Sequence, residues 1–374
     1  MPAYESPLVS AHVELGAIMT EFADWRMPVE YSSVAEETHA TRHAAGLFDV
    51  SHMGNLHVLG PGAATATREL VTRDVTAVPP CCSGYALVCN EKGGIMDDLI
   101  FMVTSESAVG LVVNASNHDK DVAWLNQHLA FHIQVELEDL RGRSFGIALQ
   151  GPRSEEILRS TNIQGCFPDL FGTFAQMRLA RVNVVVSRTG YTGEDGFELF
   201  GAAEDALPVW QTVLSFGRDF GLVPCGLAAR DVLRQEMGYP LAGQDINEET
   251  TPLEAGLRWA VDWTGDFVGK SALEHAEPAR RRIGFVMGEH GIARHGAAIF
   301  RGDEQVGRVT SGTYSHNLGA AIGQGYISAS AGLSASDEVE IQVRDRRMKA
   351  KLAKLPLVPK KTRLSWARSE RRTK

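Results

Sequence analysis

Apolar and polar residues alternate with two different periods over the first 275 positions. Runs with a period of two predict strands, and amphipathic runs with a period near 3.6 predict helices. Helices are predicted over residues 33–45, 62–71, 118–130, 153–160, 206–219 and 228–237. Strands are predicted over residues 55–59, 84–90, 97–103, 109–114, 145–150, 182–187 and 196–200. Hairpins such as the one over 84–103 favour an α+β protein with antiparallel sheets over a doubly wound parallel sheet.

The pattern changes near residue 283. From there to about 358 only strands and turns are predicted, beginning with strands over 283–287, 298–300 and 306–310. Short strands joined by turns are typical of a small β-barrel. The charged, proline-containing segment 274–282 predicts a linker. We therefore expect two α+β subdomains within 1–275 and a C-terminal β-barrel domain over 283–374.

The amino-acid composition is that of a globular protein and not of a membrane protein. The chain has 374 residues, of which 44% are hydrophobic and 22% charged, as in ordinary globular proteins. No apolar run reaches the roughly 18 residues of a membrane span, and no membrane partner is expected. The N-terminal residues resemble neither a signal nor a transit peptide, which predicts a cytoplasmic location.

Cysteine and histidine usage gives no metal signature. The five cysteines are an odd number without a Cys-x-x-Cys pair, which argues against a disulfide framework and a zinc cluster. His39/His43 and His128/His132 have the i, i+4 spacing of helical metal ligands, but neither pair has the neighbouring glutamate of a hydrolytic zinc helix. No metal is expected.

Positive charge is concentrated near the C-terminus. Thirteen Lys and Arg residues against two acids lie between Arg344 and Lys374, a net charge of +11, whereas the whole chain carries −9. Such a segment suits an acidic partner, or it is simply a solvated tail. Nucleic acid is not expected, because Trp366 alone offers a stacking surface there.

Two adjacent carboxylates, Asp97 and Asp98, follow a Gly93-Gly94 turn at the start of an apolar strand. Neighbouring side chains of a strand point to opposite faces, so only one of the two can face a shared cavity. A carboxylate there is costly to bury unless it is hydrogen-bonded or used in chemistry. The alternative is a solvated Asp-Asp turn.

Three further segments carry polar groups in suggestive patterns. Residues 48–54 include His52 and Met53, which can line a cavity or simply pack. Residues 187–198 place three glycines around Tyr191 and end near Glu198, a loop that can wrap a planar ligand. Residues 226–236 put Arg230 and Arg234 on one helix face, where they clamp a ligand carboxylate or pair with Asp231 or Glu236.

Two nucleotide motifs can be set aside. Residues 265–271 resemble a phosphate loop but have three residues instead of four before Gly-Lys-Ser, so they are interpreted as a turn that begins a helix. The sequence contains no G-x-G-x-x-G fingerprint.

In combination, these segments resemble the glycine cleavage T-proteins, a family of folate-dependent aminomethyltransferases. The resemblance implies a three-domain cloverleaf around a folate cavity. It also implies transfer of the one-carbon unit of an aminomethyl group, held on the lipoyl arm of the H-protein, to tetrahydrofolate, with release of ammonia and 5,10-methylenetetrahydrofolate. The similar segments are residues 16–19, 25–28, 48–54, 93–100, 113–115, 149–152, 188–198, 226–236, 243–245, 251–257 and 310–313.

The resemblance also implies roles for individual residues. Asp98 would be the catalytic carboxylate, which orients the folate amine and offsets developing positive charge, while Asp97 faces away and supports the turn. Glu198 would accept the paired N–H groups of the pterin edge. The remaining ligand-binding positions that the family pattern implies are Met53, Tyr85, Asn114, Tyr191, Arg230, Tyr239 and Arg294.

The chain departs from the family pattern at three positions, and two other functions share the fold. Asp24, Ala242 and His316 stand where the family usually has glycine, an aromatic residue and proline.

The first alternative function is a tetrahydrofolate-dependent demethylase of a small methylated metabolite, which would not need the lipoyl carrier. A folate-binding protein that assists iron–sulfur cluster assembly would carry a cysteine within 238–244, which this chain lacks. We expect a monomer.

Overall fold

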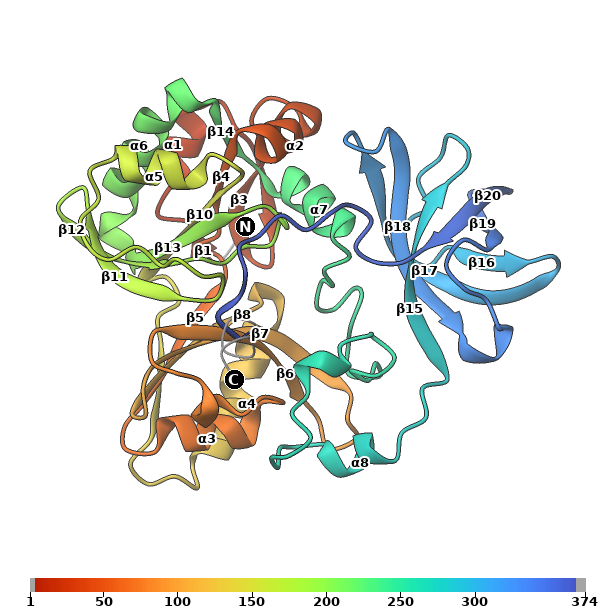
Figure 1. The fold of residues 1–374 in the computed structure, drawn as a ribbon, viewed down its shortest axis with the longest axis horizontal. Helices are drawn as coiled ribbons and strands as arrows, with labels where there is room; N and C mark the ends of the chain where they lie inside the picture. The colour runs from red at the N-terminus through yellow and green to blue at the C-terminus, as the bar shows by residue number, and fades with distance from the viewer. Residues whose placement is uncertain (1–3, 368–374) are drawn as a thin grey trace.

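The computed structural model describes residues 4–367, which form three lobes around a common centre (Figure 1). The α+β class with a terminal barrel is confirmed. Strand pairing is antiparallel except for β4 with β14 and β1 with β3. No helix among residues 4–367 is long and apolar enough to cross a bilayer.

The first lobe is built on a six-stranded sheet whose apolar face packs against helices, with Phe145, Phe197 and Trp210 in its core. A small three-stranded sheet adjoins it. In spatial order the large sheet comprises β11 (Phe174–Leu179), β12 (Val182–Ser187), β13 (Gly196–Ala202), β10 (Ser144–Gln150), β4 (Ala45–Asp49) and β14 (Leu222–Cys225). The small sheet comprises β1 (Tyr4–Glu5), β3 (Trp25–Glu30) and β2 (Ile18–Phe22). The helices are α1 (Val9–Glu14), α2 (Val34–His43), α5 (Ser154–Ser160) and α6 (Ala206–Gly217).

The second lobe is a five-stranded sheet, in which the strands Gly54–Leu59 and Ala108–Val113 alternate buried and partly exposed residues. Its order is β6 (Cys82–Cys89), β7 (Ile95–Ser105), β8 (Ala108–Val113), β5 (Gly54–Leu59) and β9 (Glu136–Asp139), with helices α3 (Ala63–Leu70) and α4 (His118–Leu129). Leu99 and Phe101 of β7 point into the core shared with these helices. Asp98 lies opposite Leu87 in the register and, by alternation, on the other face of the sheet.

The third lobe is a closed six-stranded barrel with its own apolar core. Its strands in spatial order are β15 (Arg280–Met287), β18 (Ala320–Ser328), β17 (Glu304–Ser315), β16 (Ala298–Arg301), β19 (Glu338–Val343) and β20 (Arg346–Ala353). Strand β15 begins at Arg280, so the last residues of the segment predicted as a linker already belong to the barrel.

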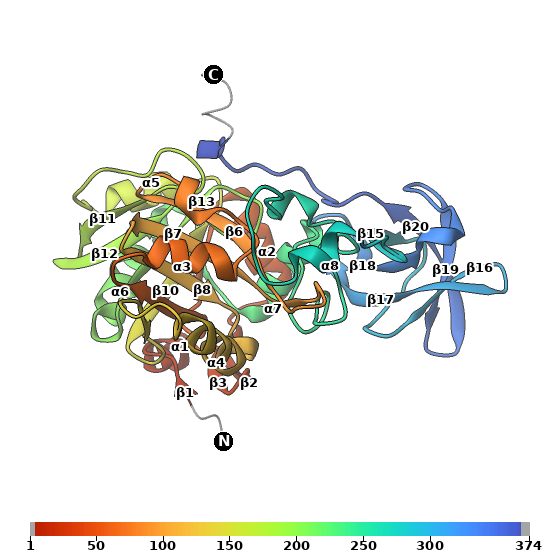
Figure 2. The same cartoon turned by 90° about the horizontal axis from the view of Figure 1, so that it is seen from below.

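Two connecting segments hold the lobes together. Helix α7 (Leu227–Glu236) runs from the first lobe toward the barrel, and the chain then follows the second lobe through α8 (Lys270–Glu274). After β20, the chain returns along one side of the molecule (Figure 2). Trp366 ends this return by donating its indole N–H to the Ser83 carbonyl at 2.9 Å.

This return path uses part of the predicted basic segment. Lys361 pairs with Glu194 at 3.1 Å, and Arg363 pairs with Glu155 at 3.1 Å. Residues 368–374 of that segment lie outside the described residues.

The β2–β3 hairpin explains one departure from the family pattern. Its two-residue turn has positive φ at Ala23 (49°) and Asp24 (64°), which is the left-handed region that favours glycine. Because the exposed Asp24 side chain forms no hydrogen bond or ion pair with the described residues, Asp24→Gly is expected to stabilise the protein by about 0.5–1 kcal/mol. The midpoint of thermal unfolding should rise for Asp24→Gly and fall for the control Asp24→Ala. Equal midpoints for the two variants would contradict this explanation.

Candidate active site

The carboxylate of Asp98 is held by one donor on each oxygen. The Tyr85 hydroxyl, from the neighbouring strand β6, donates to Oδ2 at 2.8 Å. The Asn114 side-chain amide, at the end of β8, donates to Oδ1 at 2.8 Å. Asp98 is buried, with 9% of its surface exposed, and these two bonds fix its side chain in place.

Asp97 lies on the opposite face of β7 from Asp98, although both bond to the Asn114 amide, and it does not support the Gly93–Gly94 turn as predicted. Its carboxylate accepts from the Asn114 backbone N–H at 3.1 Å and from the Asn117 amide at 2.6 Å, so it fixes the start of α4. The turn is held instead by Asn90, whose side-chain oxygen accepts from the Gly94 N–H at 3.0 Å. The prediction failed because the partners of Asp97 come from a segment about 20 residues later in the chain.

The surroundings of Asp98 hold its pKa near neutrality. Burial, followed by the negative charge of Asp97, raises the pKa of Asp98 to about 7, although the bonds from Tyr85 and Asn114 act in the opposite direction. Burial also raises the pKa of Tyr85 well above its usual value, with a further contribution from Asp98. Asp98 can therefore act on either side of a proton transfer at physiological pH.

An exposed tryptophan stacks on Tyr85 and so extends the aromatic surface beside Asp98. The ring of Trp259 stacks on Tyr85 with 5.3 Å between centroids and an interplanar angle of 26°. Trp259 is 63% exposed, which is unusual for so large an apolar side chain. Sequence reasoning missed this residue, and the only signal in the sequence was its place two residues after the family-like segment 251–257.

Glu198, on β13, keeps one carboxylate oxygen available. The Thr189 hydroxyl donates to Oε2, and Thr189 is itself linked to Ser187 at 3.1 Å. No described residue forms a hydrogen bond with Oε1. Glu198 is half-buried at the end of the glycine-rich loop that precedes β13.

Arg230, on α7, lies over the ring of Tyr191 at 4.7 Å, and Tyr191 stacks on Tyr239 at 5.5 Å. Its guanidinium forms no hydrogen bond or ion pair with the residues that the structure describes. Burial lowers the pKa of Arg230, and the charge of Glu198 acts in the opposite direction. A guanidinium without a partner beside stacked aromatic rings is suited to bind an anionic group of a planar ligand.

His52 is neutral beside this arginine. Burial and the nearby charge of Arg230 lower the pKa of His52 to about 4. Its Nδ1 is buried and has no hydrogen-bond partner among residues 4–367. Met53, the next residue, packs against the small core cluster that contains Phe48 and Leu233.

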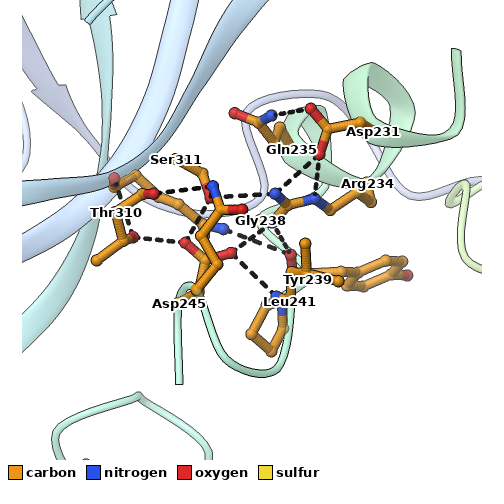
Figure 3. A network of polar contacts seen from close by, with 12 residues as sticks. Asp231, Arg234, Gln235, Gly238, Tyr239, Leu241, Asp245, Thr310 and Ser311 are labelled. Carbon is orange, nitrogen blue, oxygen red and sulfur yellow. Dashed lines mark hydrogen bonds and ion pairs between the residues drawn. The ribbon is translucent and has the colours of Figure 1, made fainter. Parts of the chain in front are cut away.

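Arg234 does not join Arg230 in a clamp. It forms an ion pair with Asp231 at 2.9 Å and another with the buried Asp245, and it donates to the Ser311 hydroxyl of the barrel at 3.0 Å (Figure 3). Its guanidinium also donates to the Tyr239 carbonyl at 3.1 Å. Residues one turn apart on α7 thus have different roles: Arg230 lies beside the aromatic pair, and Arg234 fixes the barrel and the backbone of Tyr239.

Arg294 lies apart from the other predicted residues. It is exposed on the loop between β15 and β16, where its guanidinium donates to the Gly312 carbonyl at 3.3 Å. No recorded contact joins it to Asp98, Glu198 or Arg230 in the described part of the chain, and its role in ligand binding stays a prediction.

No hydrogen bond joins the other two departures to Asp98 in the described part of the chain. Ala242 is buried in the cluster that contains Leu87 and Ile95. His316 lies in the turn between β17 and β18, with its ring edge-on to Tyr314 at 5.0 Å. Residues 4–367 contain no group of three His, Cys, Asp or Glu side chains able to hold a metal ion.

Comparisons with known proteins agree with this architecture. Residues 8–265 match the GCVT N-terminal domain, and residues 280–359 match the glycine cleavage T-protein C-terminal barrel domain. The structure is similar to the crystal structure of glycine cleavage system aminomethyltransferase T from Bartonella henselae, with a TM-score of 0.89 and 32% identity over 96% of this chain and 98% of that one.

Curated relatives extend the match in sequence. The chain is 42% identical over 357 residues to an aminomethyltransferase of Geobacillus thermodenitrificans, covering 94% of this chain and 97% of the relative. It is 38% identical over 359 residues to an aminomethyltransferase of Bacillus subtilis, covering 94% and 98%. The protein is therefore an enzyme that transfers a carbon-containing group. It belongs to the glycine cleavage T-protein family of aminomethyltransferases, which confirms the resemblance found in the sequence.

Proposed function

We propose that this protein transfers the one-carbon unit of an aminomethyl group, held on the lipoyl arm of an H-protein, to tetrahydrofolate. The carbon–sulfur and carbon–nitrogen bonds of the donor break, and two new carbon–nitrogen bonds attach the methylene group to two folate amines. The two protons that these amines lose end on the lipoyl sulfur and on the departing nitrogen. The products are a reduced lipoyl arm, ammonia and 5,10-methylenetetrahydrofolate.

The fixed carboxylate of Asp98 is the observation that carries this proposal. New bonds at an amine nitrogen create positive charge, which a preorganised carboxylate offsets without reorganisation. Tyr85 and Asn114 hold that carboxylate from both sides. Because burial and Asp97 raise the pKa of Asp98 to about 7, it can also accept a proton from an amine near neutral pH.

The atoms left without partners fit tetrahydrofolate, which supplies two nucleophilic amines when bound. The free oxygen of Glu198, beside the one that Thr189 occupies, can accept from the pterin edge. The stacked rings of Tyr191 and Tyr239 offer an aromatic surface, and Met53 adds apolar surface. The unpaired guanidinium of Arg230 is suited to the glutamate carboxylates, and we assign Arg294 the same role.

The H-protein is proposed as the partner, with fewer basic residues available to it than the sequence suggested. Lys361 and Arg363 are already paired within the chain. The β19–β20 turn remains exposed, and beside it Arg347 packs over the Phe300 ring at 3.8 Å and pairs with the exposed Asp303 at 3.6 Å. We further propose that the enzyme acts as a monomer in the cytoplasm.

The donor decides between this function and the demethylase alternative. An aminomethylated lipoyl carrier should yield methylenetetrahydrofolate with the purified protein, whereas methylated amines in place of the carrier should yield none. The family matches favour the first donor. Turnover of a methylated amine without the carrier would overturn the proposal.

Replacing Glu198 tests the pterin contact. Glu198→Gln is expected to weaken tetrahydrofolate binding by about 10- to 100-fold, because a charge-assisted pair of hydrogen bonds is replaced by one neutral acceptor. At saturating tetrahydrofolate kcat should change little. Isothermal calorimetry measures the affinity, with the exposed Glu204→Gln as the matched control. Equal affinities for the two variants would remove Glu198 from the ligand site.

A further inference from the structure

A third carboxyl group lies behind the two aspartates of β7. Asp121, on α4, is 2% exposed, and both of its oxygens are buried without any hydrogen-bond donor among residues 4–367. An ionised carboxylate in that position would lose its hydration without accepting a compensating hydrogen bond. Asp121 is not used by the mechanism described above.

The side chain of Asp121 lies against that of Asp97, and each carboxyl group shifts the pKa of the other. Two buried carboxylates cannot lie in contact unless one of them carries a proton, which can then bond to the other. Asp97 accepts N–H donors on both oxygens, from the Asn114 backbone and from the Asn117 amide. Burial raises the pKa of Asp97 as well, but these bonds lower it. Asp121 has no such donor, so the proton resides on Asp121 and the charge on Asp97.

We propose that Asp121 is a neutral carboxylic acid that donates its proton to Asp97 and so keeps a negative charge directly behind Asp98. This makes Asp121 a positioning residue that acts through Asp97 and does not touch the substrates. The inference deepens the proposed function and rests on it for the role of Asp98. Burial and Asp97 also raise the pKa of Asp121 to about 10, which agrees with the geometry.

The charged groups around this trio do not cancel the charge of Asp97. The Lys120 ammonium group, on α4, donates hydrogen bonds to the Met96 carbonyl at 2.9 Å and to the Glu248 carboxylate at 3.0 Å. On the barrel side, Arg282 of β15 acts on Tyr85. Asp98 and Asp97 share the Asn114 amide, which bonds to Oδ1 of each, at 2.8 and 2.9 Å. The negative charge of Asp97 therefore disfavours the ionised form of Asp98 and raises its pKa.

Infrared spectroscopy of protein labelled with 13C-aspartate tests the protonation directly. At about pH 8.5, above the pKa of Asp98 and below that of Asp121, wild-type protein should show the carbonyl band of one buried carboxylic acid. Asp121→Asn, which keeps a neutral donor of the same shape, should fold and lose that band. A wild-type spectrum without the band, or a variant that retains it, would overturn the proposal.

The pH dependence of kcat/KM tests the effect on Asp98. Asp121→Asn should leave the acidic limb of the profile where it is. Asp121→Leu removes the donor, so Asp97 takes up the proton itself and the limb should move to lower pH by about one unit. A role in packing alone predicts no such movement, so identical limbs for both variants would contradict the inference. If the protein shows no aminomethyltransferase turnover, the proposed function fails, and the infrared band still decides the state of Asp121.

Discussion

Replacing Asp98 with asparagine is expected to lower kcat by about 10³-fold, because the variant loses both the charge that offsets a developing cation and the group that exchanges a proton. Asparagine keeps the size of the side chain and one acceptor for Tyr85. The variant should therefore remain folded and bind tetrahydrofolate with little change. Single-turnover kinetics and calorimetry measure the two effects separately.

The pH profile adds a second readout for Asp98. Because burial and Asp97 raise its pKa to about 7, the ionised form is present only above that value, and wild-type activity should rise with pH through this region. Asp98→Asn should flatten that limb. Tyr85→Phe is the matched control, since it removes one donor and should cost only about 10-fold. Retained turnover in Asp98→Asn would remove this carboxylate from the mechanism.

The second large effect is expected at Asp245, where the barrel is fixed to α7. Asp245 is fully buried, and its oxygens accept from Arg234, the Leu241 N–H at 3.0 Å and the Ser311 hydroxyl at 2.7 Å. Asp245→Ala leaves a buried guanidinium without its main partner, a loss of about 3–5 kcal/mol in unfolding free energy. Tetrahydrofolate affinity should fall as well, because Arg234 holds the Tyr239 backbone.

Asp231→Ala is the matched control for this network. Asp231 pairs with the same Arg234, but its side chain is 45% exposed, so water replaces it when it is lost. Denaturant unfolding should show a loss of at most about 1 kcal/mol for Asp231→Ala. Equal losses for the two variants would mean that the buried network does not hold the barrel in place.

Helix α7 and strand β12 could be predicted because they obey a simple period, and both lie within one residue of their predicted bounds. Strand β4 escaped prediction as a separate element because all of its residues are buried, so no apolar-polar alternation marks it. Helix α1 has only six residues, too few to show a period.

The site was predictable only where one strand or one motif determines it. Alternation along β7 was enough to separate Asp97 from Asp98, and the family pattern pointed to Glu198 and Arg230. The pairing of Arg234 with Asp245 and the contact of Asp121 with Asp97 join segments that meet only in the folded chain. No local periodicity encodes such contacts, which is why the sequence suggested a clamp or a pair with Asp231, and the structure adds a link between lobes.

The most direct test is a single reaction that contains the protein, tetrahydrofolate and an aminomethylated lipoyl carrier. Methylenetetrahydrofolate and ammonia, counted together, should form in equal amounts, and neither should form with Asp98→Asn at a comparable rate. Folate product without ammonia, or ammonia without folate product, would contradict the proposed reaction.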